Sequence, residues 1–167
     1  MNVNRALAYL SLAAALSGCG LFAAKDEPPP PPPPTRVELK IDVAGNINPG
    51  ADGQPAPLLL RVYELKGLSA FNSADFFALY DKEQATLGAD WSRKQEFLLK
   101  PGEQRTLSLE PEADVQFIGV FAAYRQLDTA LWRASAPVKP HQTVPLELKI
   151  SGTQLNLKAV EAAPAKP

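Results

Sequence analysis

One cysteine, close to the amino terminus, is the side chain of this 167-residue sequence best suited to covalent chemistry. Cys19 follows the tripeptide Leu-Ser-Gly at the end of an apolar run, residues 6–16, which Arg5 precedes. A run of about eleven apolar residues has the size of the hydrophobic region of a signal peptide and is too short to span a bilayer. We therefore expect residues 1–18 to be a signal peptide that is cleaved before Cys19.

The residues around Cys19 resemble the lipobox of bacterial lipoproteins. In a lipobox the cysteine sulfur takes a diacylglyceryl group and the new amino terminus is acylated, so covalent lipid on Cys19 is the chemistry that this pattern predicts. The next residue is Gly20, not the aspartate that retains lipoproteins of enteric bacteria in the inner membrane, which permits delivery to the outer membrane. The alternative is an ordinary secretory signal with an unrelated cysteine nearby.

Lipid on Cys19 would leave the mature chain without a thiol, and therefore without a disulfide, a thiolate metal ligand or a cysteine nucleophile. His141, the only histidine, lies in a polar segment bounded by prolines and reads as a solvated surface residue. Zinc and iron sites draw on several His or Cys ligands, and the sequence holds no G-x-S-x-G nucleophile motif. We predict no catalytic residue, no metal, no cofactor other than the lipid and no small-molecule substrate, although carboxylate pairs of the glycosidase kind stay open.

The charge balance gives no indication of a nucleic-acid partner. The sequence contains seventeen lysines and arginines and eighteen acidic residues, and it has no run of basic residues. Binding to nucleic acid depends on clustered positive charge that releases counterions.

The chain divides into an anchor, a spacer and one domain. Seven consecutive prolines, residues 28–34, predict a semi-rigid polyproline II segment about 20 Å long. Residues 19–34 are therefore read as a lipidated amino terminus with a polyproline stalk, residues 35–160 as one domain, and residues 161–167 as a disordered tail.

Alternating and fully apolar segments predict seven or eight short strands in the domain. These are residues 36–43, 58–65, 95–100, 104–109, 115–124, 131–136, 143–150 and 153–160. The apolar run at 115–124 is expected in the middle of a sheet, and Gly119 within it indicates close packing or a bulge. The pattern predicts an all-β fold, a two-sheet antiparallel β-sandwich.

One insert, at about residues 73–87, breaks the strand pattern and predicts a short helical segment. Ser73 is a candidate N-cap, Asp75 complements the helix dipole, and Asp81 is placed to cap a further turn that ends at Gly88. Its aromatic residues share one face, which we expect to cover a sheet and not to form a ligand pocket.

The loop between the first two strands, residues 44–57, is long for a hairpin connection and rich in Asn, Asp, Gly and Pro. Such a loop on a rigid sandwich is either a recognition element or a flexible connector without function. Ile47, apolar among polar neighbours, favours a contact role.

Segments in matching order along the whole domain resemble the type VI secretion lipoproteins, the TssJ or SciN family. They are residues 48–49, 53–65, 74–80, 87–90, 99–103, 118–125 and 132–133. The main departure from the family pattern is the tract of prolines, an elaboration of the stalk.

The resemblance implies a transthyretin-like β-sandwich with an added helix, anchored on the periplasmic face of the outer membrane. It also implies binding to the periplasmic C-terminal domain of the inner-membrane protein TssM, and through TssM an assembly with TssL. In the family the loop between the first two strands contacts the partner. The contact residues expected here are Asn46, Ile47, Asn48, Asp52 and Gln54.

Two other functions stay open at this point. A pilotin or another assembly lipoprotein is the first, although such proteins are more often helical or built from repeats. A transthyretin-like enzyme or small-ligand carrier is the second, and a deep pocket lined by Asp75, Tyr80 or Tyr124 would favour it.

Overall fold

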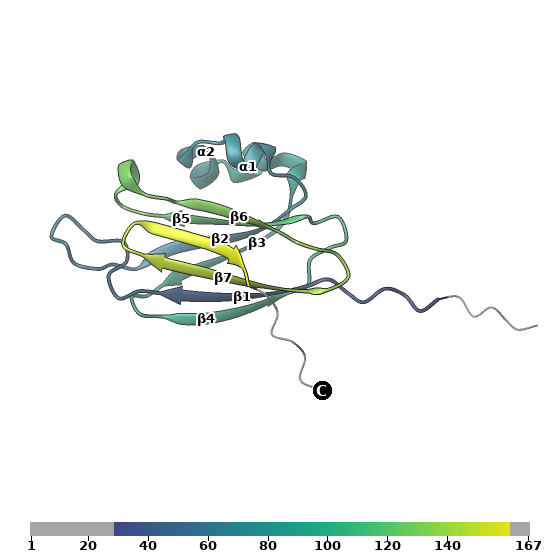
Figure 1. The fold of residues 1–167 in the computed structure, drawn as a ribbon. Coiled ribbons are helices and arrows are strands. Elements are labelled where there is room, and N and C mark those ends of the chain that lie inside the picture. The colour runs from purple at the N-terminus through teal and green to yellow at the C-terminus, as the bar shows by residue number, and fades with distance from the viewer. Residues whose placement is uncertain (1–28, 161–167) are drawn as a thin grey trace, which may run out of the picture. The chain divides into compact units, whose positions relative to one another are not determined.

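Eight strands form two facing four-stranded sheets in the computed structural model, which describes residues 29–160 (Figure 1). They are β1 (Arg36–Val43), β2 (Leu58–Leu65), β3 (Trp91–Leu99), β4 (Gln104–Leu109), β5 (Phe117–Ala123), β6 (Arg133–Pro137), β7 (Thr143–Ser151) and β8 (Gln154–Ala159). One sheet has the order β4-β1-β7-β8 and the other β3-β2-β5-β6. The predicted sandwich is therefore confirmed. The predicted signal peptide, Cys19 and the predicted tail at 161–167 lie outside the described residues.

All strand pairs within the two sheets are antiparallel except one, β1 with β7, so the β4-β1-β7-β8 sheet is mixed. The parallel register runs from Arg36 opposite Thr143 to Val43 opposite Ile150. This corrects the expectation of purely antiparallel sheets. The reason is topological: the chain between β1 and β7 crosses through the other sheet, so no hairpin requires these two strands to run antiparallel.

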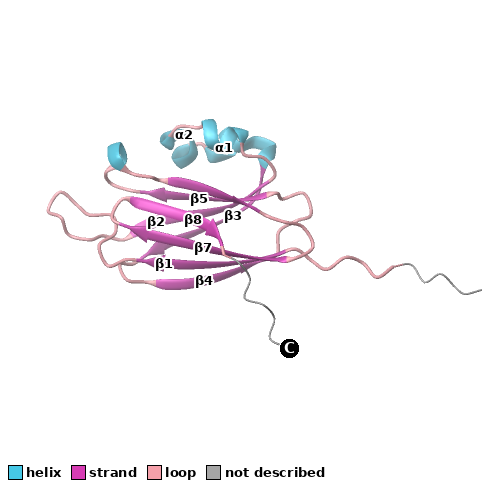
Figure 2. Cartoon of the chain, in the orientation of Figure 1, coloured by secondary structure: helices cyan, strands magenta, loops and turns pink. Residues whose placement is uncertain are grey.

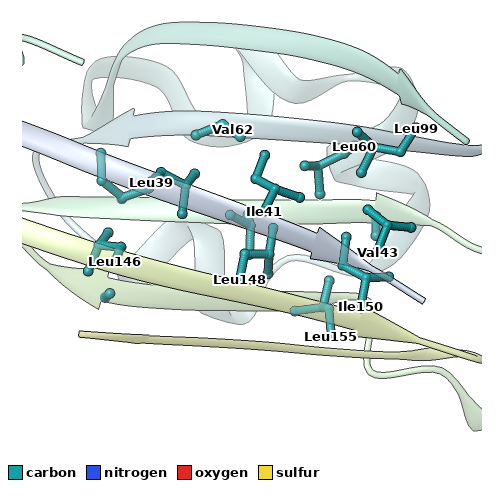
Figure 3. Close-up of a cluster of buried hydrophobic side chains, with 14 of the residues drawn as sticks. Leu39, Ile41, Val43, Leu60, Val62, Leu99, Leu146, Leu148, Ile150 and Leu155 are labelled. Atoms are coloured by element: carbon teal, nitrogen blue, oxygen red, sulfur yellow. The ribbon is translucent and has the colours of Figure 1, made fainter. Parts of the chain in front are cut away.

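The main core lies between the inner faces of the two sheets (Figure 3). Alternation along β1 and β7 buries every second residue, as the period-two pattern predicts. β5 is buried on both faces between β2 and β6, which confirms its predicted interior place. Labelled core residues in the figure are Leu39, Ile41, Val43, Leu60, Val62, Leu99, Leu146, Leu148, Ile150 and Leu155.

Three short helices cover the outer face of the β3-β2-β5-β6 sheet (Figures 1 and 2). They are α1 (Ser69–Ser73), α2 (Phe76–Asp81) and α3 (Glu83–Leu87), followed by the 3-10 turn η2 (Gly88–Asp90). A second apolar cluster fills the space between this face and the helices, with Tyr63, Leu65, Phe71, Leu79, Leu87 and Phe121 fully or almost fully buried. In residues 29–160 no helix is long and apolar enough to cross a membrane.

Gly119 of β5 sits beneath this second cluster. A Cβ atom at position 119 would lie 2.7 Å from Leu65 Cδ1 and 3.1 Å from Phe71 Cζ. Glycine is therefore required by close packing, one of the two interpretations that the sequence left open.

The helical insert begins at Ser69, four residues earlier than predicted, and its caps differ from the predicted ones. Asp75, not Ser73, is the N-cap of α2, because its side chain accepts a hydrogen bond from Ala78 N at 2.8 Å. The N-cap position of α3 is Lys82, and Asp81 is the last residue of α2. Gly88 ends α3 with a positive φ of 52°, as predicted.

Arg61, on the outer face of β2, ties the insert to the sheet. Its Nη1 donates to the carbonyl oxygens of Leu79 and Tyr80 at 3.0 and 2.9 Å, at the end of α2. Its Nε donates to Glu96 Oε2 at 2.7 Å. The two bonds from Nη1 satisfy carbonyl groups that a helix C-terminus leaves without intrahelical donors.

Glu83 of α3 closes the same network. Its Oε2 accepts a hydrogen bond from Tyr63 Oη at 2.6 Å, and the carboxylate also forms ion pairs with Lys94 and Arg61. Burial acts to raise the pKa of Glu83, but the hydrogen bonds from Lys94 and Tyr63 and the charge of Arg61 outweigh it and lower the pKa below its usual value. Glu83 therefore stays ionised and holds α3 against the sheet.

Candidate partner-binding site

Loop 44–57 lies at one end of the sandwich, together with the β5–β6 connection and the β7–β8 turn (Figure 1). The β5–β6 connection carries a short 3-10 turn, η3 (Leu127–Thr129). We call this end, made of residues 44–57, 124–132 and 151–154, the loop end. β1 starts at the opposite end, so the segment that leads back toward Cys19 leaves the domain about 25 Å away, the length of an eight-residue strand.

The loop is folded on itself. Gly50 N donates to Gln54 O at 2.9 Å and Gly53 N donates to Gly50 O at 3.0 Å, which closes the tip. At the base, Ala56 N donates to Ile47 O at 3.1 Å. Backbone bonds at both tip and base favour the recognition interpretation over that of a flexible connector.

Asn48 fastens the base of the loop to two other segments. Its Nδ2 donates to Pro57 O at 2.8 Å, and its Oδ1 accepts from Arg125 N, in the β5–β6 connection, at 2.8 Å. Its backbone N donates to Gly152 O at 2.8 Å, in the β7–β8 turn. Asn48 has a φ of 47°, a left-handed conformation that asparagine tolerates better than most residues.

Two of the five expected contact residues are buried in the structure. Ile47 is completely buried in the main core, and Asn48 is 3% exposed. The expectation that Ile47 contacts a partner is corrected: an apolar side chain in this polar loop anchors the loop to the core. Asn48 positions the loop through the bonds described above.

The other three, Asn46, Asp52 and Gln54, are exposed at the loop end. Asp52 Oδ1 accepts from Gln54 N at 3.1 Å, an Asx-turn that brings these two residues together at the tip. Asn46 lies apart from them at the base, where its Oδ1 accepts from Ser151 Oγ at 3.2 Å and Gly152 N at 3.3 Å. Their side chains can offer hydrogen bonds and one negative charge to a partner.

The β5–β6 connection contributes residues that the sequence did not single out. Gln126 Nε2 donates to Pro49 O at 3.3 Å. The guanidinium of Arg125 reaches Gly50, where an added Cβ would lie 3.2 Å from Arg125 Nη1 and 2.7 Å from Asp52 Oδ1. Residues 50 and 125 are far apart in the chain, and no local pattern signals that they meet.

A deep pocket lined by Asp75, Tyr80 or Tyr124 would have favoured an enzyme or carrier, and the structure gives these three residues structural contacts. Asp75 caps α2, and Tyr80 stacks on Phe76 with ring centroids 5.7 Å apart. Tyr124 is 3% exposed in the main core, and burial raises the pKa of its hydroxyl. Among residues 29–160, no group of three or more His, Cys, Asp or Glu side chains is placed to hold a metal ion.

His141 lies in the exposed turn between β6 and β7, as expected for a solvated residue. Its backbone N donates to Thr35 Oγ1 at 3.0 Å, and its Nδ1 lies 3.2 Å from Pro33 O. Its φ of 60° suits a tight turn. These contacts give His141 a structural place beside the start of the domain.

The fold and the loop end define a two-sheet β-sandwich module with an insert of short helices on one outer face. The chain belongs to the family of type VI secretion lipoproteins described as VasD, EvfM and TssJ, whose family model matches residues 35–153. The resemblance seen in the sequence is thereby confirmed. A comparison with curated proteins finds no match.

Three solved structures that are similar to this chain come from type VI secretion systems. The lipoprotein TssJ1 from Pseudomonas aeruginosa is 44% identical, with a TM-score of 0.76, over 78% of this chain and 100% of that one. Lip from Serratia marcescens, described as a membrane-bound component of the type VI secretion system, is 30% identical with a TM-score of 0.66, over 78% and 99%. A chain in a structure described as the TssM C-terminal domain from EAEC is 26% identical with a TM-score of 0.64, over 75% and 99%. The chain is thus a lipoprotein-family component of the type VI secretion system.

Proposed function

We propose that this chain is a lipid-anchored structural tether, which holds the periplasmic C-terminal domain of TssM, and through it TssL, at the periplasmic face of the outer membrane. The observation that carries the proposal is the ordered loop end of a domain that belongs to this family. The loop is fixed by Asn48 and presents Asn46, Asp52 and Gln54 to solvent.

The anchor is lipid on Cys19. A single acyl chain gives only marginal membrane binding, and stable anchoring takes two or more hydrophobic signals. A triacylated Cys19 would supply three chains. The stalk at residues 19–34 would then separate the domain at residues 35–160 from the membrane surface.

The proposal assigns no catalysis to the chain. Asp75, Tyr80, Tyr124 and His141 all have structural contacts in the described residues. A tether needs a stable fold, an anchor and a binding surface, and these are the features that the sequence and the domain supply. Neither nucleic acid nor a small-molecule substrate has a place in this function.

The first test is binding. The full chain, extracted in detergent, should retain the purified periplasmic C-terminal domain of TssM from the same organism in a pull-down. A variant in which residues 50–54 are replaced by a two-residue turn should lose this binding while its thermal midpoint stays nearly unchanged, because the tip is exposed and makes its bonds within itself. Recovery of a secretin, with no affinity for the TssM domain, would favour the pilotin alternative instead.

The second test is anchoring. Cys19→Ser should leave the domain folded and move it from the outer-membrane fraction to the soluble periplasm. Continued sedimentation of the Cys19→Ser protein with the outer membrane would contradict the lipid anchor.

A further inference from the structure

Arg125 differs from every other arginine in residues 29–160. Of the six arginines there, Arg36, Arg61, Arg93 and Arg105 pair with carboxylates, and Arg133 donates to the carbonyl oxygens of Phe71 and Ala74. Arg125 is exposed, and within the described residues its guanidinium takes part in no ion pair and no hydrogen bond. The guanidinium of Arg125 carries five N–H donors, which leaves it able to bind a partner at the loop end.

The backbone that carries Arg125 is nevertheless fixed. Arg125 N donates to Asn48 Oδ1 at 2.8 Å, and the next side chain, Gln126, donates to Pro49 O. The guanidinium lies over Gly50, beside the carboxylate of Asp52. A cation presented from a fixed backbone loses less conformational entropy when it binds, so it is a stronger recognition group than a charge on a mobile loop.

Leu131 lies at the other end of the same connection and is also unusual. Its side chain is 59% exposed, although its backbone is held on both sides. Leu131 N donates to Thr153 O at 3.0 Å, and Leu131 O accepts from Leu155 N at 3.3 Å, which bridges the two sheets. Thr153 follows Gly152, which donates to Asn46, so the surface from loop 44–57 to Leu131 is continuous.

We infer that the partner-binding surface is composite: residues 125–131 form its second half, in which Arg125 binds a carboxylate of the partner and Leu131 enters an adjacent apolar patch. This inference rests on the proposed function, because the partner is the same TssM domain. Arginine suits the role since its planar fork matches a carboxylate and since arginine is enriched among residues that dominate interface energetics. Leu131 adds apolar area next to the charge.

The test measures the affinity of the detergent-extracted full chain for the purified TssM domain by calorimetry. Arg125→Ala should weaken binding by about tenfold or more, Arg125→Lys should weaken it less, and Leu131→Ser should weaken it by about fivefold or more. Matched controls lie at the opposite end of the domain, where Lys139→Ala removes an exposed cation and Val160→Ser an exposed apolar side chain. Both controls should bind as the wild type does.

Two further measurements separate recognition from loss of fold. Raising the salt concentration from about 50 mM to about 500 mM should weaken the wild type more than Arg125→Ala, since screening acts on the charge that the variant lacks. Gly50→Ala changes no charge but adds a methyl group against Arg125 and Asp52, and it should also weaken binding. All variants should keep the wild-type thermal midpoint within a few degrees.

The outcomes distinguish this inference from the function on which it rests. If Arg125→Ala and Leu131→Ser bind within about twofold of wild type while the shortened loop does not bind, the composite surface is wrong and the tether stands. If the wild-type chain does not bind the TssM domain at all, the proposed function fails and the composite surface fails with it.

Discussion

Asn48 orders a loop of fourteen residues through one side chain and one backbone conformation. Its amide joins Pro57 of the same loop to Arg125 of another, and its positive φ turns the chain between them. A polar side chain that is buried must find partners, and both polar atoms of this amide do so. The loop end is thus organised by a residue that no partner needs to touch.

Replacing Asn48 tests this role. Asn48→Ala loses both side-chain hydrogen bonds. It also places alanine, which adopts the left-handed conformation less readily than asparagine, at a φ of 47°. We therefore expect a loss of about 2 kcal/mol in the free energy of unfolding. Asn48→Gly loses the same bonds without the backbone strain and should lose less. Chemical denaturation measures both, and equal losses would mean that the backbone conformation contributes nothing.

Glu64 is a buried carboxylate at the far end of β2 from the loop end. It is 2% exposed, its Oε1 lies 3.8 Å from Arg93 Nη1, and its Oε2 has no hydrogen-bond partner in residues 29–160. Burial raises the pKa of Glu64; the charge of Arg93 opposes this and that of Glu112 adds to it. Because the raised pKa disfavours the ionised form in the folded state, stability is lost as the pH rises through that pKa.

Glu64→Gln should therefore raise the thermal midpoint at about pH 7, where the wild-type carboxylate is ionised at a cost. The difference between variant and wild type should shrink as the pH falls to about 4, where the unfolded carboxyl group also becomes protonated. Thermal melts across this pH range provide the measurement. A variant less stable than wild type at neutral pH would show that the Arg93 pair outweighs burial.

At this scale the sequence singled out the loop but not which of its residues are buried. Loop 44–57 stood out by length and composition, yet Ile47 and Asn48 were assigned to a partner and are buried. A single sequence shows that a residue is apolar or polar, not which way its side chain points. The approach of Arg125 to Gly50 could not be predicted from the sequence, because it depends on how the sandwich closes.

At the scale of elements, the helical insert is held by polar contacts as well as by its apolar face. The helices have five or six residues each, too short to be stable alone. Arg61 supplies bonds to the end of α2, and its guanidinium lies 5.3 Å from the ring centroid of Tyr80. The insert therefore depends on the sheet for its order.

Arg61→Met should destabilise the protein by about 2–4 kcal/mol, since it removes hydrogen bonds to two carbonyls and leaves Glu96 without this partner. Hydrogen exchange should quicken first in residues 76–87, while amides in β1 stay protected. Arg36→Met is the control: its ion pair with Glu110 is exposed, with 52% and 65% of the two side chains accessible, so its loss should cost less than about 1 kcal/mol. A uniform acceleration of hydrogen exchange across both sheets would contradict the conclusion that Arg61 stabilises the helical insert locally.

Seven of the eight strands were predicted within two residues of both ends, and β3 was not. Residues 36–43 and 58–65 match β1 and β2, whereas β3 begins at Trp91, four residues before its predicted start. The beginning of β3 is half-exposed and polar, so its strand character comes from pairing with β2 and not from its own pattern. Similarly, Ser73 and Asp75 are both good caps, and only the chain path decides between them.

At the scale of the whole domain, the segment that leads to the proposed anchor and the proposed partner surface lie at opposite ends of the sandwich. The chain enters at the start of β1, beside His141, and the loop end lies at the other extreme of the same strand. A change to the stalk should therefore leave the binding surface untouched. Anchoring and recognition can vary independently in such a domain.

Replacing residues 28–34 by an equally long Gly-Ser segment should leave the affinity of the extracted protein for the TssM domain unchanged. Cells that carry the same variant should export less effector protein, because the domain would reach less far from the membrane. A flexible segment of this length spans about 15 Å on average, whereas polyproline II spans about 20 Å. Calorimetry and the amount of exported effector protein are the two readouts. A change in affinity would place the stalk in the interface.

The parallel pairing of β1 with β7 has a mechanical consequence. β1 follows the segment that leads to the proposed anchor and directly precedes loop 44–57, so a pull between that anchor and a partner bound at the loop would act along this one strand. β7 accompanies it from Arg36 to Val43, and β4 from Val37 to Asp42. Such a force shears both ladders at once, where a perpendicular pull would open their hydrogen bonds one after another. In the proposed function β1 would therefore carry the tensile load of the domain, and it is hydrogen-bonded to a neighbouring strand on each side along nearly its whole length.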